Sequence, residues 1–236
     1  MKGHVHGQVR SGPAVVGCCR RKGDDAEYGG AVTPQTFNVL AVCTGNICRS
    51  RIAESVLAKR FADISEIRLR SAGTRAASGW LIPEEVREIA GYMGVDEIRT
   101  RRTKQVSEQA LGDADLVLVM TRDHRREVVE LNPRIVRRTF TIRELASLAA
   151  VTRDADIISE GGGPSADRAA RLRAAVGAAG RRRSRRRSPK QVTVDDVIDP
   201  YGCDRDTYAR SALQLAPAVE GVAALFQRAL NLGEGK

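Results

Sequence analysis

Apolar residues along the chain gather in short blocks, and most blocks are followed by a segment with helical spacing. The run Phe37–Val42 is short and largely apolar and ends in a Gly-Asn turn, which is typical of a buried strand. Ile67–Ser71, Ala114–Met120 and Arg137–Ile142 have the character of further strands. The pattern therefore predicts four strands.

Segments with helical spacing connect these strands. Ser50 is a good N-cap for a helix with a one-sided apolar stripe up to Phe61, and Pro83 is expected to start a second helix. A third helix is predicted over Arg122–Leu131, and a short fourth one ends near Ala149. This alternation predicts an α/β fold, a single three-layer domain with a four-stranded parallel sheet flanked by helices on both faces.

Two regions fall outside the alternation. Residues 1–36 lack any regular period, so we expect a flexible N-terminal extension. Residues from about 154 to 191 are rich in Gly, Ala and Arg, and we expect a partly helical, partly disordered insertion there. A last helix is predicted from Asp206 to Leu232, which Pro217 should kink or start. One domain is thus expected over 37–236.

Composition narrows the range of partners. The 236 residues are 42% hydrophobic and only 4% aromatic, so stacking platforms for single-stranded nucleic acid are not expected. The net charge is +10, but six arginines within Arg181–Arg187 account for much of it. Because the excess positive charge is local and without interleaved aromatics, we interpret the run as a solvated linker. We therefore expect no nucleic-acid partner on sequence grounds, although binding of an anionic polymer by this run stays open.

The sequence predicts neither a metal site nor a membrane span. Five cysteines occur without metal-type pairs and there are only three histidines, so no zinc site or other cofactor is expected. No apolar stretch reaches the ~20 residues that cross a bilayer, and no signal peptide is recognisable at the start. We expect a cytoplasmic protein, in which cysteines stay reduced.

The strongest chemical signal is a cysteine and an arginine separated by five residues, between the first strand and the first helix. Ligands bind such sheets at the carboxyl ends of the strands, where this loop places Cys43. Gly45 and Asn46 allow a tight turn whose amide N–H groups point inward, which makes an anion cradle and stabilises a thiolate. Arg49 can donate two parallel hydrogen bonds to a phosphate, and the Ser50 hydroxyl can face the departing thiolate.

A proton donor is expected near the other end of the chain. Asp199 precedes Pro200, whose fixed φ stiffens a loop that must present one carboxyl group. No histidine is expected to compete for this role. The residues thus predict nucleophilic catalysis by Cys43, with Arg49 holding the phosphate and Asp199 as proton donor.

The stretch Val42–Ser50, followed by Ile52-Ala53-Glu54, resembles the signature loop and first helix of the low-molecular-weight protein tyrosine phosphatases. Ser71-Ala72-Gly73-Thr74 and Asp199-Pro200-Tyr201 are similar to two other fixed points of that family, and the resemblance runs from about Phe37 to Leu232. It implies a metal-independent enzyme that hydrolyses phosphotyrosine in protein substrates through a cysteinyl-phosphate. A cognate tyrosine kinase is a possible further partner.

The resemblance also implies roles for the neighbours of the catalytic residues. Ser71 should hydrogen-bond to Asn46 and support the loop. Cys48 resembles a second loop cysteine that can form a protective disulfide with Cys43 on oxidation. The substrate-binding residues that it implies are Thr44, Gly45, Asn46, Ile47, Cys48, Ser50 and Tyr201.

The chain departs from the family at two places. Arg51 stands where proline is usual and is expected to add charge near the mouth of the site. A Trp-His pair that usually follows Ser-Ala-Gly-Thr is absent, and Trp80 either lines the pocket instead or belongs to the core.

Alternative functions stay open from the sequence. Related phosphoarginine phosphatases tend to carry threonine where this chain has Ile47, so an apolar Ile47 favours an aryl ester. Arsenate reductases of similar fold use an extra cysteine pair, whereas no cysteine lies between Cys48 and Cys203 here. A catalytically inactive phosphotyrosine reader is disfavoured because Cys43, Arg49 and Asp199 are all present.

Overall fold

The computed structural model describes residues 35–76, 82–96, 98, 102–183 and 192–233. The predicted 1–36 extension lies outside the described residues, except for positions 35 and 36. Trp80 and Arg185–Arg187 also lie outside them. In chain order the elements are β1 (Phe37–Cys43), α1 (Arg49–Arg60), β2 (Ile67–Gly73), α2 (Glu84–Tyr92), α3 (Glu108–Gly112), β3 (Leu116–Val119), α4 (Arg122–Leu131), η1 (Pro133–Arg138), β4 (Thr139–Thr141), α5 (Ile142–Val151), α6 (Asp154–Ser159), α7 (Arg168–Arg182), η3 (Val192–Asp195) and α8 (Arg205–Asn231).

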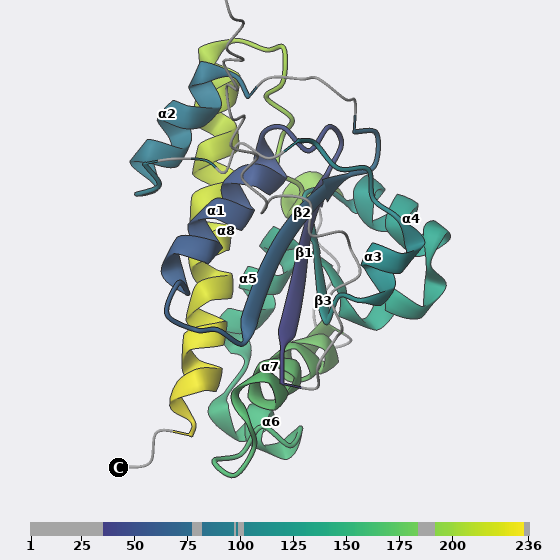
Figure 1. The fold of residues 1–236 in the computed structure, drawn as a ribbon, viewed down its shortest axis with the longest axis vertical. Helices are drawn as coiled ribbons and strands as arrows, with labels where there is room; N and C mark the ends of the chain where they lie inside the picture. The colour runs from purple at the N-terminus through teal and green to yellow at the C-terminus, as the bar shows by residue number, and fades with distance from the viewer. Residues whose placement is uncertain (1–34, 77–81, 97, 99–101, 184–191, 234–236) are drawn as a thin grey trace, which may run out of the picture. The chain divides into compact units, whose positions relative to one another are not determined.

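The four strands form one parallel sheet in the order β2-β1-β3-β4. At the end of β1, Cys43 pairs with Gly73 of β2, and Val42 pairs with Val119 of β3. The carboxyl ends of these strands therefore meet at one edge of the sheet, at the top of β1 and β2 in Figure 1. The predicted α/β fold is confirmed.

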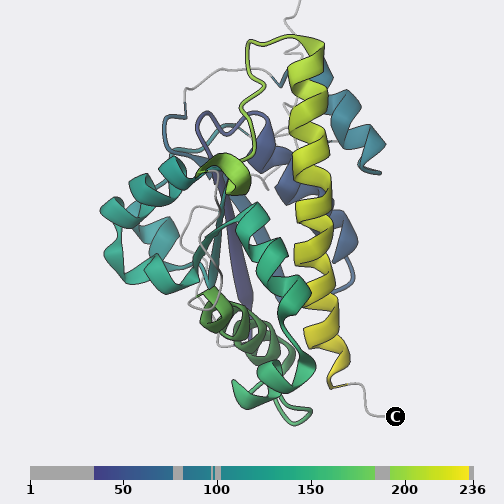
Figure 2. The same cartoon turned by 180° about the vertical axis from the view of Figure 1, so that it is seen from behind.

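Helices cover both sides of the sheet. Val39 and Ala41 of β1 share one hydrophobic cluster with residues of α1, α5, α7 and α8. Helices α3 and α4 lie on the opposite side of β3 from α8 in both views (Figures 1 and 2). Phe226 of α8 packs edge-on against Phe37 of β1, with ring centroids 5.4 Å apart. The longest helix is thus fixed directly to the first strand.

Two helices differ from their predicted form. The apolar stripe predicted for α1 is wrong in its first half, because every residue from 49 to 57 is buried on all sides of the helix. Pro217 neither starts nor interrupts α8, which runs unbroken from Arg205 to Asn231. Pro217 has no N–H group to donate to the carbonyl oxygen of Leu213. Because the side chains of Leu213 and Pro217 are both exposed, water can solvate that carbonyl.

The segment after α5 contributes two helices to the described structure. Helix α7 begins at an Asp167 N-cap and buries alanines and Leu172 in the main hydrophobic cluster. Arg183 follows α7 and donates to Glu144 of α5 at 2.7 Å, and Arg182 pairs with Asp156 of α6. These two arginines of the Arg181–Arg187 run are therefore fixed to the fold rather than placed in a linker.

Helices α5 and α8 pack at very close range. A Cβ added at Gly221 of α8 would lie 2.8 Å from the Cβ of Ala146. Because Gly221 has no side chain, α5 and α8 can pack this closely at this point. No helix in the described ranges has both the length and the apolar character needed to cross a membrane.

Candidate active site

The loop that joins β1 to α1 is supported from below by the end of β2. A Cβ added at Gly73 would lie 2.9 Å from the amide nitrogen of Asn46 and 3.0 Å from the carbonyl carbon of Gly45. The amides of Thr74 and Arg75 donate to the carbonyl oxygens of Cys43 and Thr44, respectively, each at a distance of 2.9 Å. The loop therefore rests on backbone that has no room for a side chain at this point.

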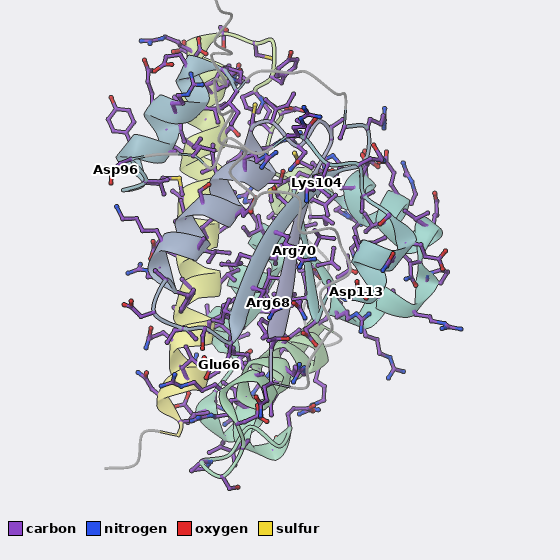
Figure 3. The ribbon with its side chains drawn as sticks, viewed as in Figure 1. Glu66, Arg68, Arg70, Asp96, Lys104 and Asp113 are labelled. Atoms are coloured by element: carbon purple, nitrogen blue, oxygen red, sulfur yellow. The ribbon has the colours of Figure 1, made fainter. Side chains whose placement is uncertain are left out.

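Asn46 is the residue around which the loop turns. Its φ is 56°, a left-handed conformation that asparagine tolerates better than most residues. Its side-chain Nδ2 donates to Ser71 Oγ at 2.8 Å, the bond that the family resemblance implied, and to Ser50 Oγ at 3.1 Å. Its Oδ1 accepts from the amide of Lys104 at 3.0 Å, and Figure 3 labels Lys104 near the end of β2. Ser71 in turn donates to the buried Glu54 at 2.5 Å.

The concave side of the loop carries a series of hydrogen-bond donors without acceptors. In the described part of the chain, none of the amide N–H groups of residues 44–48 donates to a protein acceptor. The Nε of Arg49 is buried and also lacks an acceptor among the described residues. Unbonded buried donors are rare and costly, so several in one loop indicate a site for an anion.

Cys43 directly precedes these donors in the chain and contacts the hydroxyl group of Ser50. The distance from Cys43 Sγ to Ser50 Oγ is 3.0 Å. Because Ser50 Oγ already accepts from Asn46, its own proton is available to the sulfur. The prediction of Ser50 as N-cap is wrong: the N-cap is Cys48, and Ser50 lies inside α1 with its hydroxyl turned to Cys43.

Arg49 meets Asp199 although 149 residues separate them in the chain. The guanidinium forms an ion pair with the carboxylate of Asp199, and Nη1 donates to the carbonyl oxygen of Val197 at 3.0 Å. Arg49 is only 3% exposed, whereas the Asp199 side chain is 47% exposed. The structure thus brings the predicted nucleophile, phosphate clamp and proton donor to one place.

The segment that carries Asp199 is held at consecutive backbone groups. The amide of Val197 donates to the carbonyl oxygen of Met120, just after β3, at a distance of 2.8 Å. The amide of Ile198 donates to Gln214 Oε1 at 2.8 Å, and its carbonyl oxygen accepts from Ser211 Oγ at 3.0 Å. We call residues 196–201 the acid loop, and these bonds fix it to the sheet and to α8.

Tyr201 lies at the outer end of the acid loop. Its amide donates to Asp199 Oδ1 at 3.2 Å, and its side chain is 45% exposed. Tyr201 does not line the cavity beside Arg49 and Asp199 and lies at the surface.

A cavity of about 550 Å³ opens beside Arg49 and Asp199. Thr44 is the one residue of the predicted substrate-binding set that lines it. The cavity is also lined by Arg75, His124, Glu127, Asp196 and Gln214. Two arginines and four carboxylates line its walls, and the Arg75 guanidinium pairs with Glu127 at 2.6 Å.

His124 is a site residue that the sequence analysis missed. Its Nε2 lies 2.9 Å from Thr44 Oγ1, and its Nδ1 lies 2.9 Å from Thr121 Oγ1. Burial, and next the charge of Arg49, lower the pKa of His124 to about 4, so the ring is neutral near pH 7. A histidine thus lies beside the site, but a neutral ring with both nitrogens bonded cannot act as proton donor.

The two loop cysteines occupy different environments from the exposed Cys203. Cys43 and Cys48 are both buried with free thiols. Burial, and next the nearby Cys43 and Asp199, raise the pKa of Cys48 to about 12. Cys48 is therefore a protonated, poorly nucleophilic thiol near pH 7.

Arg51 and Ile47 are placed differently from what the sequence suggested. Arg51 is 3% exposed and directed behind the loop, so it adds no charge at the mouth of the site. Ile47 is also 3% exposed and does not line the cavity. Its side chain packs beside Gly45 inside the loop. Ile47 therefore makes no direct contact with the cavity through which it could favour an aryl ester.

A signal for His124 was present in the sequence. Its helix α4 begins directly after β3, and residues that follow a parallel strand lie at the ligand-binding edge. Arg51 had no such signal, because its direction depends on how the segment around Arg102 packs against α1. Among the described residues, no group of three or more potential metal ligands could hold an ion.

Comparisons with known proteins point to one family. Residues 38–158 match the sequence family described as low molecular weight phosphotyrosine protein phosphatase. A protein-arginine-phosphatase of Geobacillus stearothermophilus is 32% identical over 128 residues, covering 54% of this chain and 81% of the relative. A probable low molecular weight protein-tyrosine-phosphatase, EpsP, of Ralstonia nicotianae is 33% identical over 107 residues, covering 45% of this chain and 71% of the relative.

A solved structure supports the same architecture. The YwlE arginine phosphatase from Geobacillus stearothermophilus superposes with a TM-score of 0.55, covering 81% of this chain and 93% of that chain. The sequence identity in this superposition is 21%, so the likeness shows the fold alone.

Proposed function

The chain belongs to the low-molecular-weight phosphotyrosine protein phosphatase family, and we propose that it hydrolyses phosphotyrosine in proteins through a cysteinyl-phosphate. The observation that carries this proposal is the row of amide N–H groups at 44–48, directly after Cys43, that have no protein acceptor among the described residues. These donors, together with Arg49 Nε, suit the equatorial oxygens of a phosphoryl group in transfer.

In the first step, the thiolate of Cys43 attacks phosphorus and the bond from phosphorus to the tyrosine oxygen breaks. Asp199, as the carboxylic acid, gives its proton to the departing phenolic oxygen. Arg49 donates to the phosphoryl oxygens while negative charge spreads over them. The contact between Arg49 and Asp199 supports this assignment, because it brings the acid to the edge of the cradle.

In the second step, the phosphoryl group is transferred from the sulfur of Cys43 to water. The Asp199 carboxylate takes a proton from the water, whose oxygen attacks phosphorus. The sulfur–phosphorus bond breaks and inorganic phosphate leaves. The Ser50 hydroxyl, 3.0 Å from Cys43 Sγ, donates a hydrogen bond to the thiolate that forms.

A second substrate class has its own support. The Geobacillus relative is named a protein-arginine-phosphatase, and Asp196 lines the cavity three residues before Asp199. A carboxylate there could accept from the guanidinium of phosphoarginine. For phosphotyrosine, the exposed side chain of Tyr201, two residues after Asp199, is proposed to pack on the substrate ring. We rank phosphotyrosine first because its neutral aromatic ring suits packing against the ring of Tyr201.

The location and regulation that we propose follow from the chemistry of cysteine. The cytoplasm is proposed because Cys43 must stay reduced to act as nucleophile. A tyrosine kinase is proposed as the source of the substrate. Cys48 is proposed to form a disulfide with Cys43 under oxidation and so to prevent overoxidation of the nucleophile.

The mechanism is tested with purified full-length protein and p-nitrophenyl phosphate in the presence of EDTA. Turnover is expected without added metal, and Cys43→Ser should abolish it. Asp199→Ala should reduce kcat by about two to four orders of magnitude, because a general acid contributes that much. Turnover by the Cys43→Ser variant equal to wild type would rule out the cysteinyl-phosphate.

The substrate class is tested by comparing kcat/KM on matched peptides that carry phosphotyrosine, phosphoarginine or phosphoserine. Phosphotyrosine is expected to be the best substrate. An Asp196→Asn variant should lose activity on phosphoarginine selectively if a guanidinium binds there. A higher kcat/KM for the phosphoarginine peptide would replace our first assignment with the second.

A further inference from the structure

Arg51 is a buried cation behind the anion-binding loop, on the side away from the cavity. Its Nε donates to the carbonyl oxygen of Asn46 at 3.1 Å, and its Nη2 donates to the carbonyl oxygen of Arg102 at 2.8 Å. Its Nη1 is 3.9 Å from Glu54 Oε2, and the Arg51 and Glu54 side chains are both 3% exposed. One guanidinium therefore links α1, the loop and the segment before Lys104.

Burial of a guanidinium is costly unless its donors are used well. Two hydrogen bonds of Arg51 go to backbone carbonyls, whereas Glu54 is at the limit of an ion pair. The charge is thus balanced by Glu54, and the directed hydrogen bonds act on the backbone. Such a side chain fixes the direction of a peptide group rather than merely filling space.

The direction of this peptide group determines a donor of the site. In a trans peptide the C=O and the following N–H point in opposite directions. Because Arg51 holds the Asn46 carbonyl behind the loop, the N–H of Ile47 must point to the concave side. Ile47 N–H is one of the amide groups at 44–48 that lack an acceptor.

We propose that Arg51 is a positioning residue whose guanidinium holds the Asn46–Ile47 peptide so that its N–H donates to the substrate phosphoryl group. The proposal rests on the phosphatase function proposed above. Asn46 has a positive φ and is the point at which the loop turns, so its peptide group needs outside support. Arg51 supplies that support through a side chain, and it does not touch the substrate.

The test uses Arg51→Lys, Arg51→Gln and Arg51→Met in the full-length protein. Lysine keeps the positive charge but cannot make two directed hydrogen bonds in a fixed fork. Glutamine retains one donor without charge, and methionine retains only the apolar volume. The matched control is Arg60→Met, because Arg60 lies at the other end of α1, is half exposed and pairs with Glu220.

The measurements are kcat and KM for p-nitrophenyl phosphate, the inhibition constant of inorganic phosphate, and the pH at which iodoacetate alkylates Cys43 half-maximally. For Arg51→Met and Arg51→Lys we expect kcat to fall and the phosphate inhibition constant to rise, each by about 10- to 100-fold, because small misplacements of a site cost this much. The alkylation midpoint should move to higher pH. The control should stay within about twofold of wild type.

Thermal unfolding separates positioning from simple stabilisation. A variant that melts earlier but, where fully folded, retains the wild-type inhibition constant and alkylation midpoint would overturn the proposal. So would an Arg51→Lys variant with wild-type kcat, because charge alone would then suffice. If Arg51→Met fails to fold, the lysine and glutamine variants decide in the same assays. Absence of turnover in the wild type would instead refute the phosphatase function.

Discussion

Gly73 offers the sharpest test of how the end of β2 shapes the anion-binding loop. It pairs with Cys43 in the sheet, and its backbone contacts the underside of the loop. Its φ is not in the left-handed region, so alanine is compatible with the backbone conformation. The change Gly73→Ala therefore perturbs the loop through space alone.

The size of the effect follows from the distances. An alanine Cβ would lie 2.9 Å from Asn46 N and 3.0 Å from the carbonyl carbon of Gly45, and closer still to the carbonyl oxygen of Thr44. Ordinary contacts between such atoms are at about 3.5–4.0 Å, so the loop must retreat by roughly 0.5–1 Å. A displacement of that size in a site costs about 10²-fold in rate, and overpacking costs about 1–3 kcal/mol of stability.

The assay measures kcat/KM for p-nitrophenyl phosphate together with the melting temperature. Gly73→Ala is expected to lower kcat/KM by about 10²-fold, or ~2.7 kcal/mol in transition-state stabilisation, while most molecules remain folded. Gly91→Ala is the matched control, because a Cβ at Gly91 in α2 would meet nothing within 4 Å. Alanine also favours a helix interior over glycine, so the control should be fully active and at least as stable as wild type.

The result that contradicts this reasoning is a Gly73→Ala variant with wild-type kcat/KM. It would mean that the loop shifts freely without loss of function, and that its amide positions do not govern catalysis. A variant that is merely unfolded would be identified by its melting temperature, and its activity would then be measured at low temperature where the folded fraction is high.

Further predictions follow from burial at His124, Cys48 and Gly221. The pKa of His124 is lowered to about 4 in the folded protein, so the unfolded chain binds an extra proton between that value and about 6.5, and stability falls as the pH drops through this window. Wild type should lose roughly 2 kcal/mol more than His124→Gln in urea unfolding between about pH 7 and pH 5; equal losses would contradict the assigned cause. Because the pKa of the Cys48 thiol is about 12, iodoacetamide near pH 7 should label the exposed Cys203 but leave Cys48 unmodified, as mass spectrometry of tryptic peptides would show. Gly221→Ala should destabilise the protein by about 1–3 kcal/mol, since its Cβ would meet Ala146 at 2.8 Å, and an unchanged melting temperature would indicate that α5 and α8 separate easily.

The fold was largely predictable because the apolar blocks specify strands and helices locally. Phe37–Val42 and Arg122–Leu131 were placed within one residue of their ends, since each is bounded by a turn or a cap. Pro217 was misjudged because sequence rules treat a proline as a break. They cannot see that an exposed helix face lets water solvate the freed carbonyl.

The site was predictable where chemistry and spacing coincide, and less so where packing decides. Cys43, Arg49 and Asp199 were chosen from the sequence, and the structure brings them together as the fold requires. Their catalytic roles stay predictions until the variants are assayed. Arg51 and His124 depend on which segments pack against the loop and the cavity. A single sequence does not contain that information locally, because Arg102 and Thr44 are distant from their partners in the chain.

Helix α8 has a consequence for how activity and unfolding are connected. Ser211 and Gln214 hold the acid loop near the start of the helix, while Phe226 packs on β1 further along. The cradle around Cys43, in contrast, is built from β1, β2 and α1. Partial fraying of the start of α8 would therefore remove proton transfer before it disturbs anion capture. Such a form would still bind a phosphorylated substrate but would transfer its phosphoryl group to sulfur slowly, acting as a substrate trap made by local melting rather than by mutation.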